Sequence, residues 1–195
     1  MTARKDTREA LLRAGVELFI DGGYDYVGTN AILARAGVPR GSFYHHFTDK
    51  LDFAIATAQH YYDQHLPLLD RILTEDSQFP LARLRRYFET LRNFYRDRRW
   101  TGGCLLGMLS QELPDREGKA RAALATIFSR WRHRLVDCLR EAQGEGQIAK
   151  NSDLEELAAF LIDGWEGALL AMKITRSGAP LDRFIRICFD QKLIS

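Results

Sequence analysis

A cluster of hydrogen-bonding and aromatic side chains occupies the seven residues from 40 to 46. The polar and aromatic side chains are those of Arg40, Ser42, Tyr44, His45 and His46, and Gly41 and Phe43 complete the segment. Hydroxyl and guanidinium groups bind phosphate and guanine, rings allow close approach, and a glycine lets the main chain come near a duplex. This mixture is unusual for a buried packing helix. The cluster therefore favours nucleic-acid recognition, although a polar helix on the surface of a small bundle is the simpler alternative.

Two short helices are expected to position this cluster. Helical spacing predicts one over residues 29–36 and another over 39–46, separated by the turn at Gly37, which together form a helix-turn-helix. Pro39 suits the first turn of the second helix because its φ is fixed near the helical value. Lys50 opens the next helix and adds a cation beside helix-terminal N–H groups, an arrangement that binds phosphate.

Helical periodicity continues over almost the whole chain, and sustained strand alternation appears nowhere. We therefore expect an all-α fold of about nine helices, with the first one ended by Asp21-Gly22-Gly23. We expect a DNA-binding domain over residues 1–50 and a ligand-binding and dimerisation domain over 51–195, connected by a long helix. The predicted segments are 4–21, 29–36, 39–46, 49–74, 81–98, 104–113, 117–143, 153–176 and a last one after Pro180.

Composition permits nucleic-acid binding without arguing for it. The 195 residues are 46% hydrophobic and 28% charged, and the net charge is only +2. Affinity for DNA would depend on where the charges lie. The charged N-terminus and the absence of an apolar run of about 18 residues predict a cytoplasmic protein without a membrane span. Three cysteines without a CxxC pair argue against a disulfide framework or a zinc site, and we expect no cofactor or metal.

Residues 23–50 read GYDYVGTNAILARAGVPRGSFYHHFTDK. This stretch resembles the signature of the TetR family of transcriptional regulators, which implies a homodimer that binds double-stranded DNA through a helix-turn-helix. Val27 departs from the family pattern, since many members have Thr there, and this makes Thr29 the better candidate for a phosphate contact. By resemblance, the DNA-contacting positions are Thr29, Arg40, Gly41, Ser42, Tyr44, His45, His46 and Lys50.

Cys104 is the candidate sensing residue of the C-terminal half. It follows two glycines and opens the short segment 104–113, where helix N-terminal N–H groups, with Arg98 and Arg99 nearby in sequence, would lower a thiol pKa. Such a thiol reacts with electrophiles and oxidants, whereas most cysteines behave as small buried hydrophobes. The stretch GGCLLGMLSQEL resembles a TetR subgroup that responds to reactive electrophiles or unsaturated small acids. Cys138 and Cys188 are expected to be packing residues.

Aromatic residues and methionines in this half can line an effector pocket, because such pockets are mostly apolar. Each of them can equally belong to the core. An arginine-rich run between residues 83 and 99 is ordinarily a solvated face, or it could favour an anionic effector. The predicted effector-sensing residues are Cys104, Trp100, Met108, Phe128, Trp131 and Trp165.

The last two predicted helices carry broad apolar stripes that include Leu169 and Phe184. The family resemblance implies that this pair of helices forms the homodimer interface, over residues 153–193. A two-fold dimer places two recognition segments about one turn of DNA apart, so the operator is expected to be a pseudo-palindrome.

Two other function classes are alternatives to a DNA-binding regulator. A cysteine-dependent reductase or peroxidase would use Cys104 as nucleophile, but the sequence spaces no base to activate it, and residues 23–50 would have no purpose. A helical interaction module would lack DNA binding altogether. We therefore predict a repressor, not an enzyme, that a small-molecule or electrophilic effector releases from its operator.

Overall fold

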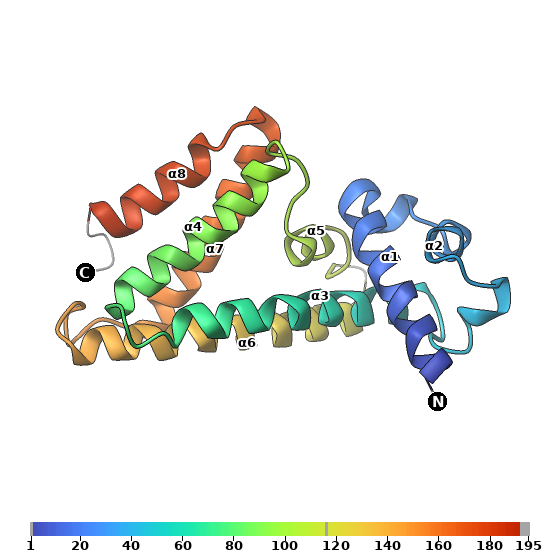
Figure 1. The fold of residues 1–195 in the computed structure, drawn as a ribbon, viewed down its shortest axis with the longest axis horizontal. Helices are drawn as coiled ribbons and strands as arrows, with labels where there is room; N and C mark the ends of the chain where they lie inside the picture. Colours follow the sequence, from blue (N-terminus) through green and yellow to red (C-terminus); the bar gives the residue numbers. More distant parts are fainter. Residues whose placement is uncertain (1, 116, 192–195) are drawn as a thin grey trace. The chain divides into compact units, whose positions relative to one another are not determined.

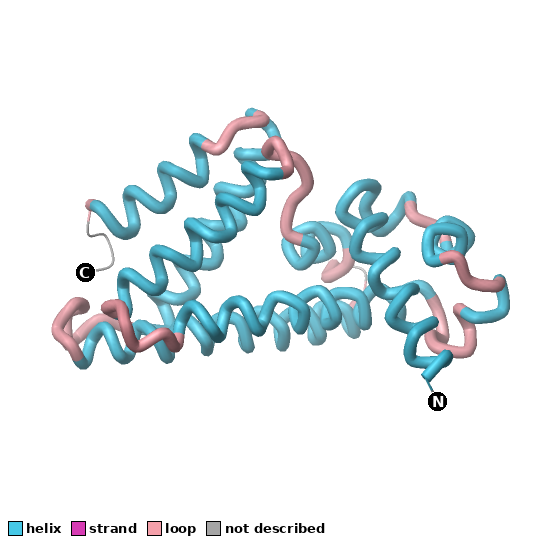
Figure 2. Tube along the Cα trace, viewed as in Figure 1, coloured by secondary structure: helices cyan, strands magenta, loops and turns pink. Residues whose placement is uncertain are grey.

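The computed structural model describes residues 2–115 and 117–191, which form helices joined by short loops (Figure 1), with no strand among these residues (Figure 2). This confirms the predicted all-α class. The described residues contain eight α-helices, one 3-10 turn (η1, Arg40–Ser42) and one π-helical turn (η2, Arg186–Asp190), where about nine helices were expected. None of the described helices is both long and apolar enough to cross a membrane. The helices are α1 (Thr2–Tyr26), α2 (Thr29–Ala36), α3 (Lys50–Leu73), α4 (Pro80–Asp97), α5 (Leu105–Glu112), α6 (Gly118–Gly144), α7 (Leu154–Thr175) and α8 (Ala179–Ile185).

The chain divides into two compact units. One contains Met1–Gln64 and Cys104–Ile127, and the other contains His65–Gly103 and Phe128–Ser195. The division after Gln64 lies inside α3. The inclusion of 104–127 with the N-terminal helices was not expected, because sequence periodicity carries no information on which helices pack together. The functional boundary at residue 50 stays a prediction.

Aromatic packing holds α1 and α3 together in the first unit. The ring of Phe53, in α3, lies 5.8 Å from that of Phe19 in α1, centroid to centroid. At Gly15 the two helices approach so closely that a Cβ would lie 2.5 Å from Phe53 Cζ and 2.9 Å from Thr57 Oγ1. Only glycine fits at that crossing without a shift of the neighbouring side chains.

Two glycines mark the ends of helical stretches in the first unit. Gly23 has a φ of 77° and a ψ of 170°, so the helical conformation of α1 is interrupted there, as the Asp21-Gly22-Gly23 sequence predicted. Gly37 has a φ of 65° and ends α2 in the left-handed conformation, with Val38 N donating to Leu33 O at 3.2 Å. A positive φ costs glycine little, which explains its use at both positions.

Three large aromatic side chains from three helices form the core of the second unit. Phe88 of α4 lies 5.2 Å from Trp165 of α7 and 5.1 Å from Phe184 of α8. The rings of Trp165 and Phe184 are 5.6 Å apart, and all three side chains are buried. Such rings each remove 150–250 Å² of surface from water and account for much of the packing energy of a core. This cluster therefore fixes α4, α7 and α8 against one another.

Candidate functional site

The segment predicted as the second helix of the helix-turn-helix is only partly helical. Arg40–Ser42 form a single 3-10 turn, and hydrogen-bonded turns follow to residue 46. Ser42 N donates to Pro39 O at 2.9 Å, and Phe47 N donates to Phe43 O at 3.0 Å. The structure thus differs from the predicted continuous helix over 39–46, because glycine, serine, tyrosine and histidine are weaker helix formers than the alanines of α2.

Buried rings, in place of a regular helix, fix this segment to the rest of the unit. Phe43 is fully buried and Phe47 is 3% exposed, and both rings lie within about 5 Å of Phe53, at centroid distances of 5.2 and 4.9 Å. Between them the chain turns Tyr44 and His45 outward, with the Tyr44 side chain 68% exposed. The segment therefore presents polar and aromatic groups on a rigid apolar support.

Arg40 lies beside the start of α2, where it contacts Asn30. Arg40 Nη2 donates to Asn30 Oδ1 at 3.4 Å, and Thr29 is the half-exposed first residue of α2. Val27, the departure from the family pattern, is buried and so serves the core. Asn30 was not among the predicted contact residues, although an amide side chain next to a threonine at the start of a helix could have indicated a polar contact there.

Lys50 is held against the end of α1. Its Nζ lies 4.3 Å from the centroid of the Tyr24 ring and donates to the main-chain oxygen of Asp25 at 3.4 Å. Partial burial lowers the pKa of Lys50, while the nearby carboxylates of Asp25 and Glu112 oppose that change. The ammonium group is thus fixed in position at the first residue of α3.

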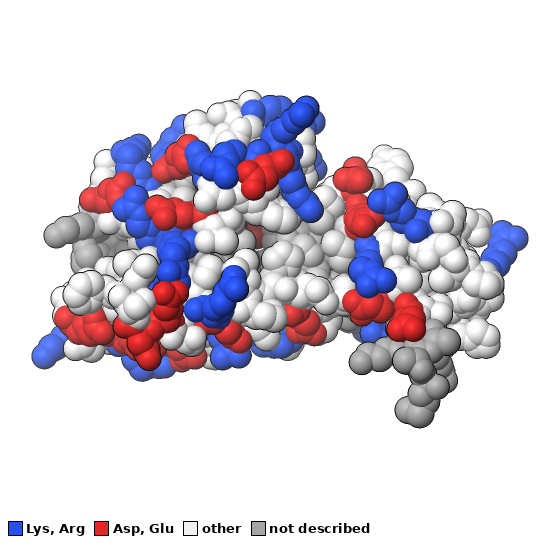
Figure 3. All heavy atoms as spheres, viewed as in Figure 1, with Lys and Arg blue, Asp and Glu red and all other residues white. Residues whose placement is uncertain are grey.

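Charge within the segment itself is sparse, and its Arg35 is ion-paired with Glu17 of α1. Residues 26–48 contain two arginines, Arg35 and Arg40, and no Asp or Glu. Figure 3 shows, by contrast, that acidic and basic side chains alternate over the face formed by α4 and α8. With two arginines and Lys50 as the cations of residues 26–50, any affinity of this segment for phosphate would depend on a few placed groups.

Cys104 occupies the N-cap position of α5, as the sequence predicted. Its main-chain oxygen accepts from Met108 N at 3.0 Å, and its thiol makes no capping hydrogen bond to the helix. The side chain is buried, with 8% of its surface exposed. Cys104 and the half-buried Met108 belong to the first unit, whereas the other four predicted effector residues belong to the second.

Those four residues have different surroundings. Trp165 is 1% exposed in the core beside Phe88, which supports the packing interpretation. Phe128 and Trp131 are stacked, with centroids 6.1 Å apart, and the buried Trp131 Nε1 has no hydrogen-bond acceptor among the described residues. The Arg92 guanidinium lies over the Trp100 ring, with 5.2 Å between Arg92 Cζ and the ring centroid. Of these side chains, the orphan Trp131 donor is the one most suited to a polar ligand.

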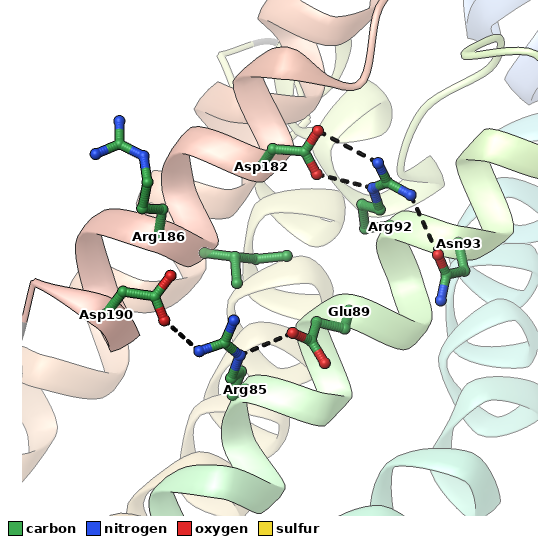
Figure 4. Close-up of a pocket in the computed structure, with 8 residues that line it drawn as sticks. Arg85, Glu89, Arg92, Asn93, Asp182, Arg186 and Asp190 are labelled. Carbon is green, nitrogen blue, oxygen red and sulfur yellow. Dashed lines mark hydrogen bonds and ion pairs between the residues drawn. The ribbon is translucent and has the colours of Figure 1, made fainter.

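The arginine-rich run of α4 is largely paired with acidic side chains of its own unit (Figure 4). Arg92 Nε donates to Asp182 Oδ1 at 2.8 Å, and Arg85 bonds both Glu89 and Asp190. Together with Asn93, Ile185 and Arg186, these residues line a shallow pocket between α4 and α8. Because carboxylates already neutralise much of this charge, the pocket gives little support to the predicted preference for an anionic effector. The other paired arginines of the run are Arg83 with Glu141, Arg86 with Glu75 and Arg96 with Asp97.

Comparison with known proteins decides the class of protein. The family model for bacterial regulatory proteins of the tetR family matches residues 11–57, which include the whole helix-turn-helix segment. The model for the tetracyclin repressor-like C-terminal domain matches residues 80–188. The chain belongs to the TetR family. It is therefore a DNA-binding transcriptional regulator, and the resemblance drawn from residues 23–50 is confirmed.

Relatives match this TetR regulator over most of its length. The transcriptional regulator AcuR of Cereibacter sphaeroides is 38% identical over 91% of this chain and 81% of its own. The transcriptional repressor DhaR of a Mycobacterium species is 34% identical over 99% of this chain and 96% of its own. These relatives are regulators of transcription and not enzymes, which agrees with the prediction that this chain is not an enzyme.

Two solved structures share the fold. A regulatory protein TetR from Rhodobacter sphaeroides superposes with a TM-score of 0.86 at 37% identity, covering 92% of this chain and 95% of the other. The reduced form of Escherichia coli NemR superposes with a TM-score of 0.88 at 28% identity, covering 97% of each chain. The similarity thus extends through both the DNA-binding and the C-terminal portions of the regulator.

Helix α7 of this TetR regulator carries an exposed apolar stripe, with the exposed Asp163 on the same side. On α7, Phe160, Leu170 and Ile174 are 47%, 52% and 75% exposed and follow one side of the helix together with Gly167. Leu169 and Phe184, which the sequence suggested for the interface, are instead buried at 3% and 8%. The expectation for those two was wrong because the core of their own unit already covers them.

Proposed function

We propose that this TetR regulator is a cytoplasmic, homodimeric repressor that an inducer releases from a pseudo-palindromic operator. The observation that carries the proposal is the segment from Pro39 to Phe47. Its two phenylalanines are buried while Tyr44 and His45 project outward. A rigid support under exposed donors is what sequence recognition requires, because mobile donors would lose entropy on binding.

The proposed contacts divide by chemistry. Hydroxyl groups and the Lys50 ammonium suit phosphate oxygens, whereas Arg40 and the histidines can reach base edges in the major groove. Gly41 is exposed and a Cβ built on it meets no atom within 4 Å, so its use would be to admit DNA and not to relieve crowding within the protein. The full proposed set is Thr29, Arg40, Gly41, Ser42, Tyr44, His45, His46 and Lys50.

The proposed dimer forms through residues 153–193. The stripe of Phe160, Leu170 and Ile174 is apolar and exposed in the single chain. In a two-fold dimer the same stripe on a second copy would cover it, because such an interface is self-complementary. This burial would make two DNA-reading segments act together on one operator.

The proposed inducer is a small molecule or an electrophile that acts on the C-terminal domain, with Cys104 as the reactive thiol. Burial raises the pKa of Cys138 to about 12 and that of Cys188 to about 11, which leaves Cys104 as the candidate for thiol chemistry. The similar structure of E. coli NemR is that of its reduced form. A non-covalent effector site is the alternative, for which Trp100 and Trp131 of the second unit are candidate contacts.

The test is an electrophoretic mobility shift with the DNA upstream of the regulator's own gene. The wild-type dimer should bind this DNA more tightly than a scrambled duplex, and an electrophile should release it. Tyr44→Ala should weaken binding, and Tyr26→Ala is a matched control because Tyr26 is 93% exposed and lies outside the proposed contact set. Equal binding by wild type and Tyr44→Ala would remove residues 39–47 from the interface.

A further inference from the structure

The side chain of Glu112 closes the interrupted end of α1. Glu112 is the last residue of α5, and its two carboxylate oxygens accept from two successive main-chain N–H groups. Tyr24 N donates to Oε1 at 3.1 Å, and Asp25 N donates to Oε2 at 3.0 Å. Hydrogen bonds to a carboxylate are stronger than neutral ones, and two together also fix orientation. All of these residues belong to the first unit.

Gly23 provides the space for this carboxylate. A Cβ at Gly23 would lie 2.8 Å from Glu112 Oε1, a distance that real Cβ atoms essentially never show, and the φ of 77° adds strain for any other residue. The non-helical φ and ψ of Gly23 interrupt α1 directly before the two amides that bond the carboxylate, those of Tyr24 and Asp25. The glycine, the two amides and the acid therefore form one arrangement.

The same two residues of α1 hold Lys50 from α3. The Tyr24 ring faces the Lys50 Nζ at 4.3 Å, and the Asp25 main-chain oxygen accepts from it at 3.4 Å. Glu112 binds the N–H groups of Tyr24 and Asp25, while Lys50 binds the ring of one and the carbonyl of the other. The coulombic influence of Glu112 on the pKa of Lys50 agrees with this proximity.

We propose that Glu112 is a positioning residue for DNA binding, which fixes the Tyr24–Asp25 main chain and through it the ammonium of Lys50. The inference rests on the proposed function in one respect, the role of Lys50 as a phosphate contact. It assigns α5 a second role beyond packing, because the eight-residue helix carries Cys104 at its start and Glu112 at its end. A displacement of α5 would withdraw the carboxylate and loosen Lys50.

The experiment measures DNA affinity of the full-length dimer as a function of salt, by fluorescence anisotropy with an operator duplex and with a scrambled one. Glu112→Ala should weaken both complexes about tenfold, because the Lys50 ammonium is then no longer held in place for a phosphate contact. The slope of log affinity against log salt should fall by about 0.9, as for one lost phosphate contact. Glu112→Gln keeps one acceptor oxygen and should fall between wild type and Glu112→Ala.

A double-mutant cycle with Lys50→Ala separates positioning from general stabilisation. If Glu112 acts through Lys50, the double variant should bind no more weakly than Lys50→Ala alone. Additive losses, or an unchanged salt slope in Glu112→Ala, would mean that Glu112 only stabilises the fold. Tighter binding by both Glu112 variants would show that its charge simply repels phosphate, and would overturn the proposal.

Two further variants keep the test decisive. Gln111→Ala is the matched control, because Gln111 is the exposed neighbour of Glu112 and its side chain donates to Gly107 O within α5. Gly23→Ala should reproduce the Glu112→Ala phenotype without removing the acid, since the new Cβ displaces the carboxylate. Wild-type affinity in Lys50→Ala would defeat the proposed contact set and this inference with it. Weak binding by Lys50→Ala beside normal binding by Glu112→Ala would defeat this inference alone.

Discussion

The thiol of Cys138 donates a hydrogen bond to the main-chain oxygen of Pro80, with 3.3 Å between Sγ and that oxygen. A thiol that donates is protonated, and burial raises the pKa of this one from 9.0 to about 12. Burial likewise raises the pKa of Cys188 to about 11. Because the thiolate is the reactive species, we expect these two cysteines to react slowly near neutral pH. Their burial supports the expectation that they are packing residues.

Thiol labelling should therefore be selective. At pH 7.5, iodoacetamide should modify native protein at Cys104 only, and Cys104→Ser should stay unmodified over the same time. All three thiols should react in concentrated urea, which serves as the control for reagent and exposure. Intact-mass and peptide mass spectrometry follow the adducts. Labelling of Cys138 in the folded protein as fast as in urea would contradict its assignment as buried and protonated.

The raised thiol pKa values also predict a dependence of stability on pH. Between about pH 9 and 12 the folded chain keeps protons on Cys138 and Cys188 that the unfolded chain releases, so the free energy of unfolding should fall as pH rises through this window. Below pH 9 both the folded and the unfolded chain hold these protons, so these thiols no longer make the free energy of unfolding depend on pH. Urea titrations from pH 7 to 11 measure the decline, and Cys138→Ala should flatten it. An equal slope in that variant would exclude Cys138 as its source.

Substitutions in the proposed DNA-contacting segment should separate function from folding. Tyr44→Ala should lower operator affinity about tenfold or more, on scrambled DNA as well, because phosphate contacts act on every sequence alike. Its melting temperature should hardly change, since the side chain is 68% exposed. Phe43→Ala removes a fully buried ring and should cost about 3–5 kcal/mol of stability. Arg40→Ala should instead relax sequence preference, which a selection among randomised duplexes would detect.

The dimer prediction now concerns the exposed stripe of α7. Leu170→Glu or Ile174→Glu should dissociate the dimer in sedimentation experiments, because each places a charge inside the proposed apolar contact. Operator affinity should fall in parallel, since a single half-site binds weakly. Phe79→Glu makes the same kind of change at a 70% exposed position before α4 and should leave the dimer intact. Unchanged sedimentation of both α7 variants would place the interface elsewhere.

A steric prediction concerns Gly178, which lies against Trp100. A Cβ on Gly178 would sit 2.4 Å from Trp100 Cη2 and 2.8 Å from its Cζ2. Gly178→Ala should therefore destabilise the protein by about 1–3 kcal/mol, the usual cost of overpacking. Gly118→Ala is the control, because nothing lies within 4 Å of the added methyl group. Urea unfolding measures both, and an equal stability for the two variants would show that Trp100 moves aside freely.

Sequence periodicity predicted the helices well and their partners poorly. The expected segment 81–98 became α4 at Pro80–Asp97, because a proline at the start and a regular apolar face act locally. The link from Glu112 to Tyr24 spans 88 residues and leaves no local signal. The sequence likewise did not indicate whether Leu169 or Leu170 faces the core, since α7 is apolar on two sides. Only the packing of Trp165 and Phe184 decides which side faces the core.

The DNA-contacting segment shows the same division between local and tertiary information. Residue types identified Arg40 and Tyr44 as candidate contacts, and the structure leaves both exposed. The conformation was not predictable, because the buried rings of Phe43 and Phe47 hold it, and their partner Phe53 belongs to the next helix. Helix propensities reflect only the weak helix formers between residues 40 and 46 and carry no information on these tertiary contacts.

The final prediction is that Cys104 is the switch. Its side chain is buried at the N-cap of α5, so an adduct on Sγ adds volume where close packing leaves little room. The helix must then shift, and its far end carries Glu112, which holds the main chain beneath Lys50. An unsaturated aldehyde, to which the thiolate adds across the carbon–carbon double bond, should therefore release wild-type protein from its operator.

Cys104→Ser should bind the operator normally and ignore the aldehyde, and Cys138→Ser should respond as the wild type does. Mobility shifts with a quinone and with hypochlorite extend the test to other electrophiles and to oxidants, and mass spectrometry of the released protein should place the adduct on Cys104. Release of Cys104→Ser at the same aldehyde concentration would make Cys104 a packing residue. The effector site would then be a non-covalent one, for which the unpaired indole N–H of Trp131 is the first side chain to substitute.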